Sequence, residues 1–317
     1  MKAPKRQIPA RQPSVATIVE PAADLFVDDA IRSLESRAVA YLNAGLGVHL
    51  RGPAGAGKTT LALQIASRIG RPIVFLTGDA WMTSGHLVGR EAGATSRQVV
   101  DRFVHNVVKI ETETAAVWRD NALTHAILDG HTLIYDDFTR STAAANNPLL
   151  SALEERRLIL ASRQGERVVK AHPEFRAILT SNPTDYAGVN PPQDALVDRV
   201  VTFDVEGHDR STEIGIVAAR SGLDPNVAAG IVDIVRALRA SPRLALSPSL
   251  RSAIMIAKVA QREGLAADAA EPRFLQLTLD VLESKLVDRG PDSRLAFRDD
   301  VVASLRKLGR AEVRSAA

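Results

Sequence analysis

A glycine-rich loop near the start of the chain restricts its possible folds more than any other feature. Residues 52–60 read Gly-Pro-Ala-Gly-Ala-Gly-Lys-Thr-Thr, which fits the pattern G-x-x-x-x-G-K-S/T of a phosphate-binding loop. An apolar run at 47–51 precedes the loop, and an Ala/Leu-rich helical pattern at 60–69 follows it. A phosphate loop lies between a strand and a helix, so both neighbours favour it over a turn that binds no ligand.

The residue types in this loop suit a nucleoside triphosphate and its Mg²⁺ ion. Glycines let backbone N–H groups surround phosphate oxygens, and the start of the following helix adds positive potential. Lys58 would reach the β- and γ-phosphates, and the hydroxyl of Thr59 would be a ligand of the metal. The residues predicted to bind the nucleotide are Gly52, Pro53, Ala54, Gly55, Ala56, Gly57, Lys58, Thr59 and Thr60.

Composition narrows the class of protein further. A chain of 317 residues with 45% hydrophobic residues can bury a large core in about two domains. It contains no cysteine, which excludes disulfides and thiolate metal sites. We find neither a signal-peptide pattern nor an apolar span of about 18 residues, so we expect a cytoplasmic protein that does not insert into a membrane.

The distribution of charge argues against a nucleic-acid partner. The formal charge is +3, but four basic residues precede the first acid, Glu20, so the remaining chain carries one net negative charge. A nucleic-acid binder would show a basic body, which is not seen. Residues 1–18 combine these cations with three prolines and predict a flexible basic tail. Whether such a tail only solubilises the protein or docks onto a partner stays open.

Apolar patterns predict five strands, at 47–51, 72–77, 131–135, 175–181 and 200–205. Helical spacing predicts helices at 24–42, 60–69, 98–110, 118–129 and 143–155, and the runs 158–160 and 168–170 predict a hairpin. Beyond residue 210 every apolar pattern is helical, at 212–221, 225–240, 247–263 and 272–286. We therefore predict an α/β domain that ends near residue 207 and an all-helical domain after it.

Polar residues end two of the predicted strands. The third run is followed by Asp136 and Asp137, and the fourth by Asn182 and Pro183. Downstream of a phosphate loop, an acid at a strand end is the expected anchor of Mg²⁺, which assigns Asp136 to the metal. Asn182 could orient the attacking water or sense the γ-phosphate. An Asn-Pro pair also begins turns, and taken in isolation it favours the turn.

The order of elements resembles that of the AAA+ ATPases over nearly all of residues 20–290. The predicted hairpin and three stretches resemble the MoxR branch, whose members carry inserts in helix 2 and before sensor 1. The stretches are NNPLLSALEE (146–155), AHPEF (171–175) and TSNP (180–183). Five others are similar to the gas vesicle protein N family: TGDAWMTS (77–84), LVG (87–89), VVDRFVHNVVK (99–109), TLIYD (132–136) and SLRSAIMIAK (249–258).

The resemblance implies a P-loop AAA+ module, with a parallel sheet sandwiched by helices, followed by a smaller all-helical lid domain. Its expected parts are the tail at 1–18, the nucleotide-binding domain at 19–207, the lid at 208–300 and a basic C-terminal tail at 301–317. The nucleotide-binding domain would carry both inserts of the MoxR branch.

The resemblance also implies roles for single residues. Lys58 and Thr59 match Walker A, Asp136 and Asp137 match Walker B, Asn182 matches sensor 1, Arg199 matches the arginine finger and Arg251 matches sensor 2. An arginine finger acts on the γ-phosphate of a neighbouring subunit, so the implied assembly is a ring, expected to be a hexamer. Without the resemblance, an ion pair would be the simpler explanation of either arginine. The family has Asp-Glu at the strand end, and Asp137 is a shorter acid.

The function that the resemblance implies is ATP-driven remodelling or placement of gas vesicle structural proteins while vesicles form and enlarge. Gas vesicle structural or accessory proteins would be the partners, and the protein would be cytoplasmic and vesicle-associated. One alternative is a MoxR-type activator of another complex, such as rubisco or nitric oxide reductase. A second is a scaffold that binds ATP and hydrolyses it slowly, which Asp137 favours. A third is a DNA-acting ATPase, which the charge disfavours.

Overall fold

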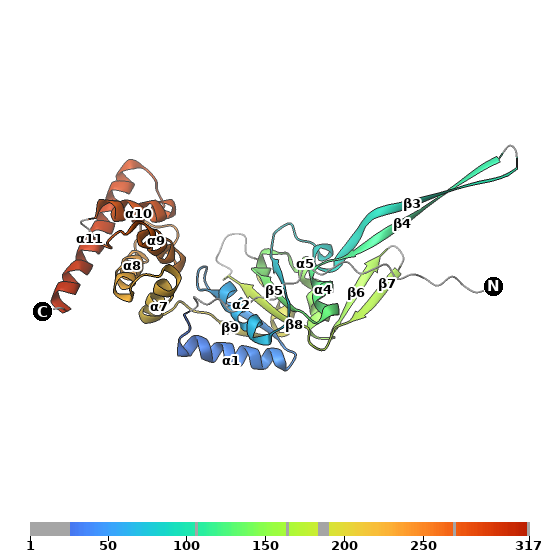
Figure 1. Cartoon of the computed structure of the whole chain (residues 1–317), viewed down its shortest axis with the longest axis horizontal. Coiled ribbons are helices and arrows are strands. Elements are labelled where there is room, and N and C mark those ends of the chain that lie inside the picture. Colours follow the sequence, from blue (N-terminus) through green and yellow to red (C-terminus); the bar gives the residue numbers. More distant parts are fainter. Residues whose placement is uncertain (1–25, 105–106, 163–164, 183–189, 269–270, 316–317) are drawn as a thin grey trace. The chain divides into compact units, whose positions relative to one another are not determined.

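The computed structural model describes residues 26–104, 107–162, 165–182, 190–268 and 271–315 (Figure 1). The predicted tail at residues 1–18 and Pro183 lie outside these ranges. The described residues divide into two compact units. The first contains residues 38–50 and 65–203, and the second contains residues 26–37, 51–64 and 204–315.

A five-stranded sheet forms the centre of the first unit. Its strands are β1 (Gly47–Arg51), β2 (Ile73–Thr77), β5 (Thr132–Asp136), β8 (Arg176–Ser181) and β9 (Val200–Asp204), in the order β2-β5-β8-β1-β9. β2, β5 and β8 pair in parallel, so their carboxyl ends lie along one edge. All five strands coincide with predicted apolar runs, and the predicted α/β fold with a helical C-terminal region is confirmed.

Strand β5 illustrates the helical cover of this sheet. Leu133 and Tyr135 belong to the main apolar cluster of this unit, and Ile134 between them is also fully buried. A strand that is buried on both faces reads as a continuous apolar run, which explains its pattern in the sequence. Ile127 and Leu149 belong to the same cluster. They come from helices α4 (Ala122–Asp129) and α5 (Ala143–Leu153), respectively.

The segment before α4 differs from the prediction. Spacing predicts a helix at 98–110, but the backbone forms an antiparallel hairpin, a long two-stranded ribbon in Figure 1. The segment is dense in β-branched residues, which favour extended chain, and this preference outweighs a helical spacing of only a few positions. The predicted helix at 118–129 begins only at residue 122, because residues 118–120 still pair with the opposite strand of the hairpin and Asn121 is the N-cap of α4. The elements concerned are α3 (Ser84–Val88), β3 (Gly89–Val104) and β4 (Val107–Asp120).

The second predicted hairpin is confirmed. β6 (Arg157–Ser162) and β7 (Gly165–Lys170) pair antiparallel. Leu158 and Val169 are cross-strand partners buried in the main cluster, whereas the neighbouring partners Ile159 and Val168 are exposed. One face of this hairpin therefore anchors it to the first unit.

Helices dominate the second unit. Helix α8 (Pro225–Leu238) buries Ile231, Val235 and Leu238 along one face, at the spacing that an amphipathic helix requires. None of the helices in the described ranges is long and apolar enough to cross a membrane. The helices are the first part of α1 (Asp29–Asn43), the first part of α2 (Lys58–Ile69), α7 (Arg210–Ser221), α8 (Pro225–Leu238), α9 (Leu250–Glu263), α10 (Pro272–Leu282) and α11 (Pro291–Ser315).

Helix α11 corrects the predicted basic tail at 301–317. The helix runs to Ser315, and Phe297, Val301 and Leu305 are buried in the core of the second unit. These three residues recur every four positions, so one apolar helix face continues across the predicted boundary at residue 300. The apolar core of the second unit therefore extends beyond that boundary.

Candidate functional site

The glycine-rich loop joins β1 to α2, as predicted. Gly55 and Gly57 both have a φ of 84°, a left-handed conformation that glycine adopts without steric cost. Lys58 is the first residue of α2 and only 6% exposed, and its Nζ donates to the carbonyl of Pro53 at 2.9 Å. The loop thus curves over its own lysine at a helix N-terminus, where N–H groups and the helix dipole favour an anion.

Close neighbours in the second unit require glycine at two loop positions. A Cβ on Gly52 would lie 2.0 Å from the carbonyl oxygen of Val205. A Cβ on Gly55 would lie 2.6 Å from the Cβ of Ser249. The loop therefore packs between the segment that follows β9 and the turn that precedes α9.

A pocket of about 510 Å³ lies beside this loop. Small-molecule sites are typically about 300–1,000 Å³, so a nucleotide fits this volume. Gly55, Gly57 and Thr60 form one side of the pocket, and the first half of α1 and residues 204–209 form others. Arg251 of α9 also lines it, so the predicted sensor 2 arginine and the phosphate loop face one cavity.

The far side of the pocket combines an apolar wall with polar groups. Phe26 lines it, and a Cβ on Gly215 of α7 would lie 2.4 Å from the Phe26 ring, so glycine allows this ring to pack against the helix. Burial opposes ionisation of Asp28, but hydrogen bonds from the Ile31 N–H and the Thr212 hydroxyl outweigh it and lower the pKa of Asp28. Such a mixture suits a purine base with its ribose.

In the first unit, the carboxyl ends of β5 and β8 bring together the predicted acids and amide. The Thr180 hydroxyl donates to Asp136 Oδ1 at 2.6 Å and accepts from the Asp137 N–H at 2.9 Å. Asn182 Nδ2 donates to Asp137 Oδ1 at 2.9 Å. Asn182 therefore does more than begin a turn, because it holds the second acid.

The backbone at Asp137 has an unusual conformation. Its φ of 51° and ψ of 42° are left-handed, which is uncommon for a residue other than glycine. A Cβ on Gly78 would lie 2.1 Å from the Asp137 carbonyl oxygen, so the chain packs tightly there. Arg140 Nε lies 3.2 Å from Asp137 Oδ2. One hydrogen bond and one ion pair thus hold the carboxylate, and strained residues of this kind cluster at functional sites.

Tyr135 anchors the strand directly before these acids. It is fully buried, its hydroxyl donates to Asn146 Oδ1 at 3.0 Å, and Ser141 Oγ lies 2.8 Å from the same hydroxyl oxygen, to which it can donate. Burial raises the pKa of Tyr135 to about 12. The hydroxyl is therefore neutral near pH 7 and serves to hold the strand end.

The two predicted arginines lie in different surroundings. Arg251 lines the pocket, as described above. Arg199 lies just before β9, and its Nε donates to Glu154 Oε2 at 2.7 Å while Nη1 donates to the Ala195 carbonyl. In the single chain Arg199 thus forms the ion pair that the sequence alone favoured.

Sequence reasoning missed three residues of the site. Thr180 joins the two acids, Arg140 holds the second one, and Ser249 packs on the loop. Only Thr180 had a usable signal, because it alternates with Asn182 on the strand beside β5 and so lies on the same side. Arg140 and Ser249 reach the site through turns whose paths the sequence does not specify.

Comparisons with known proteins place the chain among its relatives. Residues 47–200 match a family described as AAA domain (dynein-related subfamily). The gas vesicle ATPase GvpN of Ancylobacter aquaticus is 47% identical over 285 residues, which cover 89% of this chain and 80% of that protein. GvpN of Haloferax mediterranei is 40% identical over 311 residues, with 97% and 84% covered. The solved structure of a Thermotoga maritima RuvB variant, 16% identical, has a TM-score of 0.50 and covers 83% of this chain and 72% of its own, which supports the fold alone.

Proposed function

The chain belongs to the GvpN family of gas vesicle ATPases and is an AAA+ ATPase, and from this premise we propose that it remodels or places gas vesicle structural proteins while vesicles form and enlarge. The observation that carries the proposal is the pocket in which the phosphate loop and Arg251 face one cavity. A nucleotide in this pocket contacts both the phosphate loop and Arg251, so its hydrolysis changes the contacts that Arg251 makes. We place the protein in the cytoplasm, associated with vesicles.

We assign the binding of ATP to the phosphate loop. The loop N–H groups and Lys58 hold the β- and γ-phosphates, and Arg251 contacts the nucleotide from α9. Thr59 and Asp136 would hold Mg²⁺, which neutralises phosphate charge when it is bound. Both supply oxygen donors, as Mg²⁺ prefers, and the Thr180 hydroxyl orients the Asp136 carboxylate for this task.

We assign the orientation of the attacking water to Asp137. Asn182 and Arg140 hold its carboxylate, which limits the positions that the water can take. Asp137 is one methylene shorter than the family's acid, and we infer slow hydrolysis. In the single chain, Glu154 pairs with Arg199 and Glu155 pairs with Arg157.

We further propose a ring, expected to be a hexamer, in which Arg199 completes the site of a neighbouring subunit. To reach a neighbour's γ-phosphate, Arg199 must leave Glu154, and the phosphate charge compensates for that lost partner. ATP with Mg²⁺ should therefore promote assembly, which light scattering would detect.

Mixed assemblies should show that the site is shared between subunits. Arg199→Ala subunits mixed with wild type are expected to suppress hydrolysis by more than their own fraction, because each also disables a neighbour. Arg210→Ala subunits provide a control, since this exposed arginine pairs with Asp233 instead. ATPase activity plotted against the mutant fraction is the measurement. A loss strictly proportional to that fraction would contradict a shared site.

The client can be tested by stimulation of turnover. We expect purified gas vesicles or vesicle structural proteins to raise the ATPase rate several-fold, because a remodelling enzyme couples its cycle to a client. DNA and an unrelated protein complex serve as controls. A rate that none of the vesicle components changes, with ATP still bound, would favour the scaffold with weak hydrolysis, for which Asp137 is the specific argument. Stimulation by DNA alone would favour a DNA-acting ATPase, and stimulation by the unrelated protein complex alone would favour an activator of another complex.

A further inference from the structure

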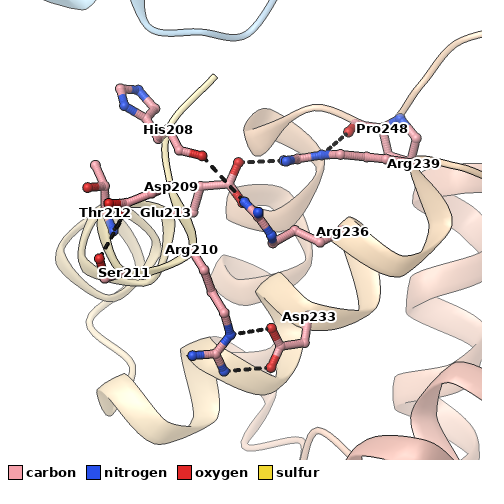
Figure 2. A network of polar contacts seen from close by, with 10 residues as sticks. All are labelled: His208, Asp209, Arg210, Ser211, Thr212, Glu213, Asp233, Arg236, Arg239 and Pro248. Atoms are coloured by element: carbon pink, nitrogen blue, oxygen red, sulfur yellow. Dashed lines mark hydrogen bonds and ion pairs between the residues drawn. The ribbon is translucent and has the colours of Figure 1, made fainter. Parts of the chain in front are cut away.

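Glu213 is a buried acid that the roles assigned so far do not use. It lies on α7, and its side chain is 3% exposed. Its Oε2 accepts from Arg236 Nη1 at 3.0 Å, and Arg239 Nη2 lies 2.7 Å from its Oε1. Figure 2 shows both arginines reaching this carboxylate from the end of α8. One acid therefore holds two guanidinium groups in fixed orientations.

Each of these arginines also binds a carbonyl outside the helix pair. Arg236 Nη1 donates to the carbonyl of His208 at 3.3 Å, and Arg239 Nε donates to the carbonyl of Pro248 at 3.0 Å. The two carbonyls belong to segments without regular structure, one before α7 and one before α9 (Figure 2). The network thus fixes two stretches of chain that helical hydrogen bonds do not hold.

Both stretches border the pocket. His208 lines it, and His208 Nε2 lies 3.8 Å from where a Cβ of Gly57 would be. Ser249, directly after Pro248, packs on Gly55, and Arg251 lines the pocket two residues later. A shift of either carbonyl would therefore move groups that face the nucleotide.

A simpler explanation is that Glu213 only joins α7 to α8. The same two helices already carry such a link, because Arg210 binds Asp233 through two hydrogen bonds of 2.6 and 2.7 Å. That pair is more exposed, and neither of its partners binds a carbonyl of the pocket segments in Figure 2. The two acids therefore separate the alternatives, since both join the helices and only Glu213 connects to the pocket.

We propose that Glu213 is a positioning residue for the nucleotide and acts through Arg236 and Arg239 on the His208 segment and on the turn that leads into α9, the helix that carries Arg251. The proposal rests on the function proposed above, in which this pocket binds ATP. Glu213 itself touches neither the phosphate loop nor, in this assignment, the nucleotide. Its effect on binding passes through the two arginines.

The test compares Glu213→Gln with Asp233→Asn, which remove the same charge from the same helix pair. We expect Glu213→Gln to raise the Kd for ATP about tenfold or more, since the loss of one hydrogen bond to a charged group changes an equilibrium constant by about tenfold or more. Asp233→Asn should stay within about twofold, as exposed pairs contribute little. Equal changes in the two variants would overturn the proposal.

Two further variants cover the case in which Glu213→Gln folds poorly. Arg239→Lys keeps a positive charge beside Glu213, but its single ammonium nitrogen replaces the separate Nε and Nη2 that face the Pro248 carbonyl and Glu213, so ATP binding should weaken while the Tm stays close to wild type. In an Arg251→Ala background, Arg239→Lys should have little additional effect, because both act on one contact. If the effects of Arg239→Lys and Arg251→Ala on the binding free energy add fully, the proposed route from Arg239 to Arg251 is contradicted. If Arg251→Ala alone leaves the Kd unchanged, the assigned role of Arg251 fails, independently of Glu213.

Discussion

Lys58→Ala is expected to abolish tight ATP binding, with a Kd about 100-fold above that of the wild-type protein. The Lys58 ammonium is almost fully buried beside the loop, where a charge-assisted contact with phosphate is strongest. Backbone N–H groups alone do not supply a full positive charge at the β- and γ-phosphates. Isothermal titration with ATP and Mg²⁺ would measure the change, and a Tm measurement would show that the variant is folded.

Arg68→Ala provides the matched control for Lys58. Arg68 lies in the last turn of the same helix, on its exposed side, so the substitution removes the same charge away from the loop. Its Kd should remain within about twofold of wild type. An unchanged Kd for Lys58→Ala would show that the phosphate-loop assignment is wrong. If the assignment is right, cells that carry Lys58→Ala are expected to form no vesicles.

Strands of the central sheet could be predicted because their sequence signal is local. Residues 133–135, directly before Asp136, form a continuous apolar run, as expected for a strand with both faces covered. The phosphate loop could be predicted for the same reason, since its glycines, Lys58 and Thr59 all lie within residues 52–60. In both cases one short segment contains the whole pattern.

The sequence led to a wrong secondary structure where two local signals competed, and it did not reveal contacts between segments that are distant in the chain. The hairpin β3–β4 has a few apolar residues at helical spacing, but pairing with the returning strand satisfies its β-branched residues better. The contact of Ser249 with Gly55, and the bonds from Arg236 and Arg239 to distant carbonyls, join segments far apart in the chain. Contacts of this kind depend on the complete fold, so they cannot be predicted from local patterns in a single sequence.

Asp137→Asn is expected to reduce the rate of ATP hydrolysis by about 100-fold or more and to leave ATP bound. Asparagine tolerates the left-handed conformation found at this position and still accepts a hydrogen bond from Asn182. The substitution therefore removes the charge without disturbing the turn, and the Kd for ATP should stay within about threefold. Asp194→Asn, an exposed acid at the start of α6 (Asp194–Val197), is the control and should hydrolyse ATP normally.

A longer acid at the same position, Asp137→Glu, tests whether the short side chain of Asp137 limits the rate of ATP hydrolysis. One more methylene extends the carboxylate by about 1 Å, and misplacement of that size can cost on the order of 100-fold, so we expect faster hydrolysis with an unchanged Kd. The left-handed backbone opposes this gain, because glutamate fits that conformation less well than aspartate or asparagine. Single-turnover hydrolysis decides between them. A chemical rate equal to or below that of wild type would mean that the turn after Tyr135, held by Thr180 and Gly78, already places Asp137 at the correct reach, and the proposal of slow hydrolysis would then be wrong.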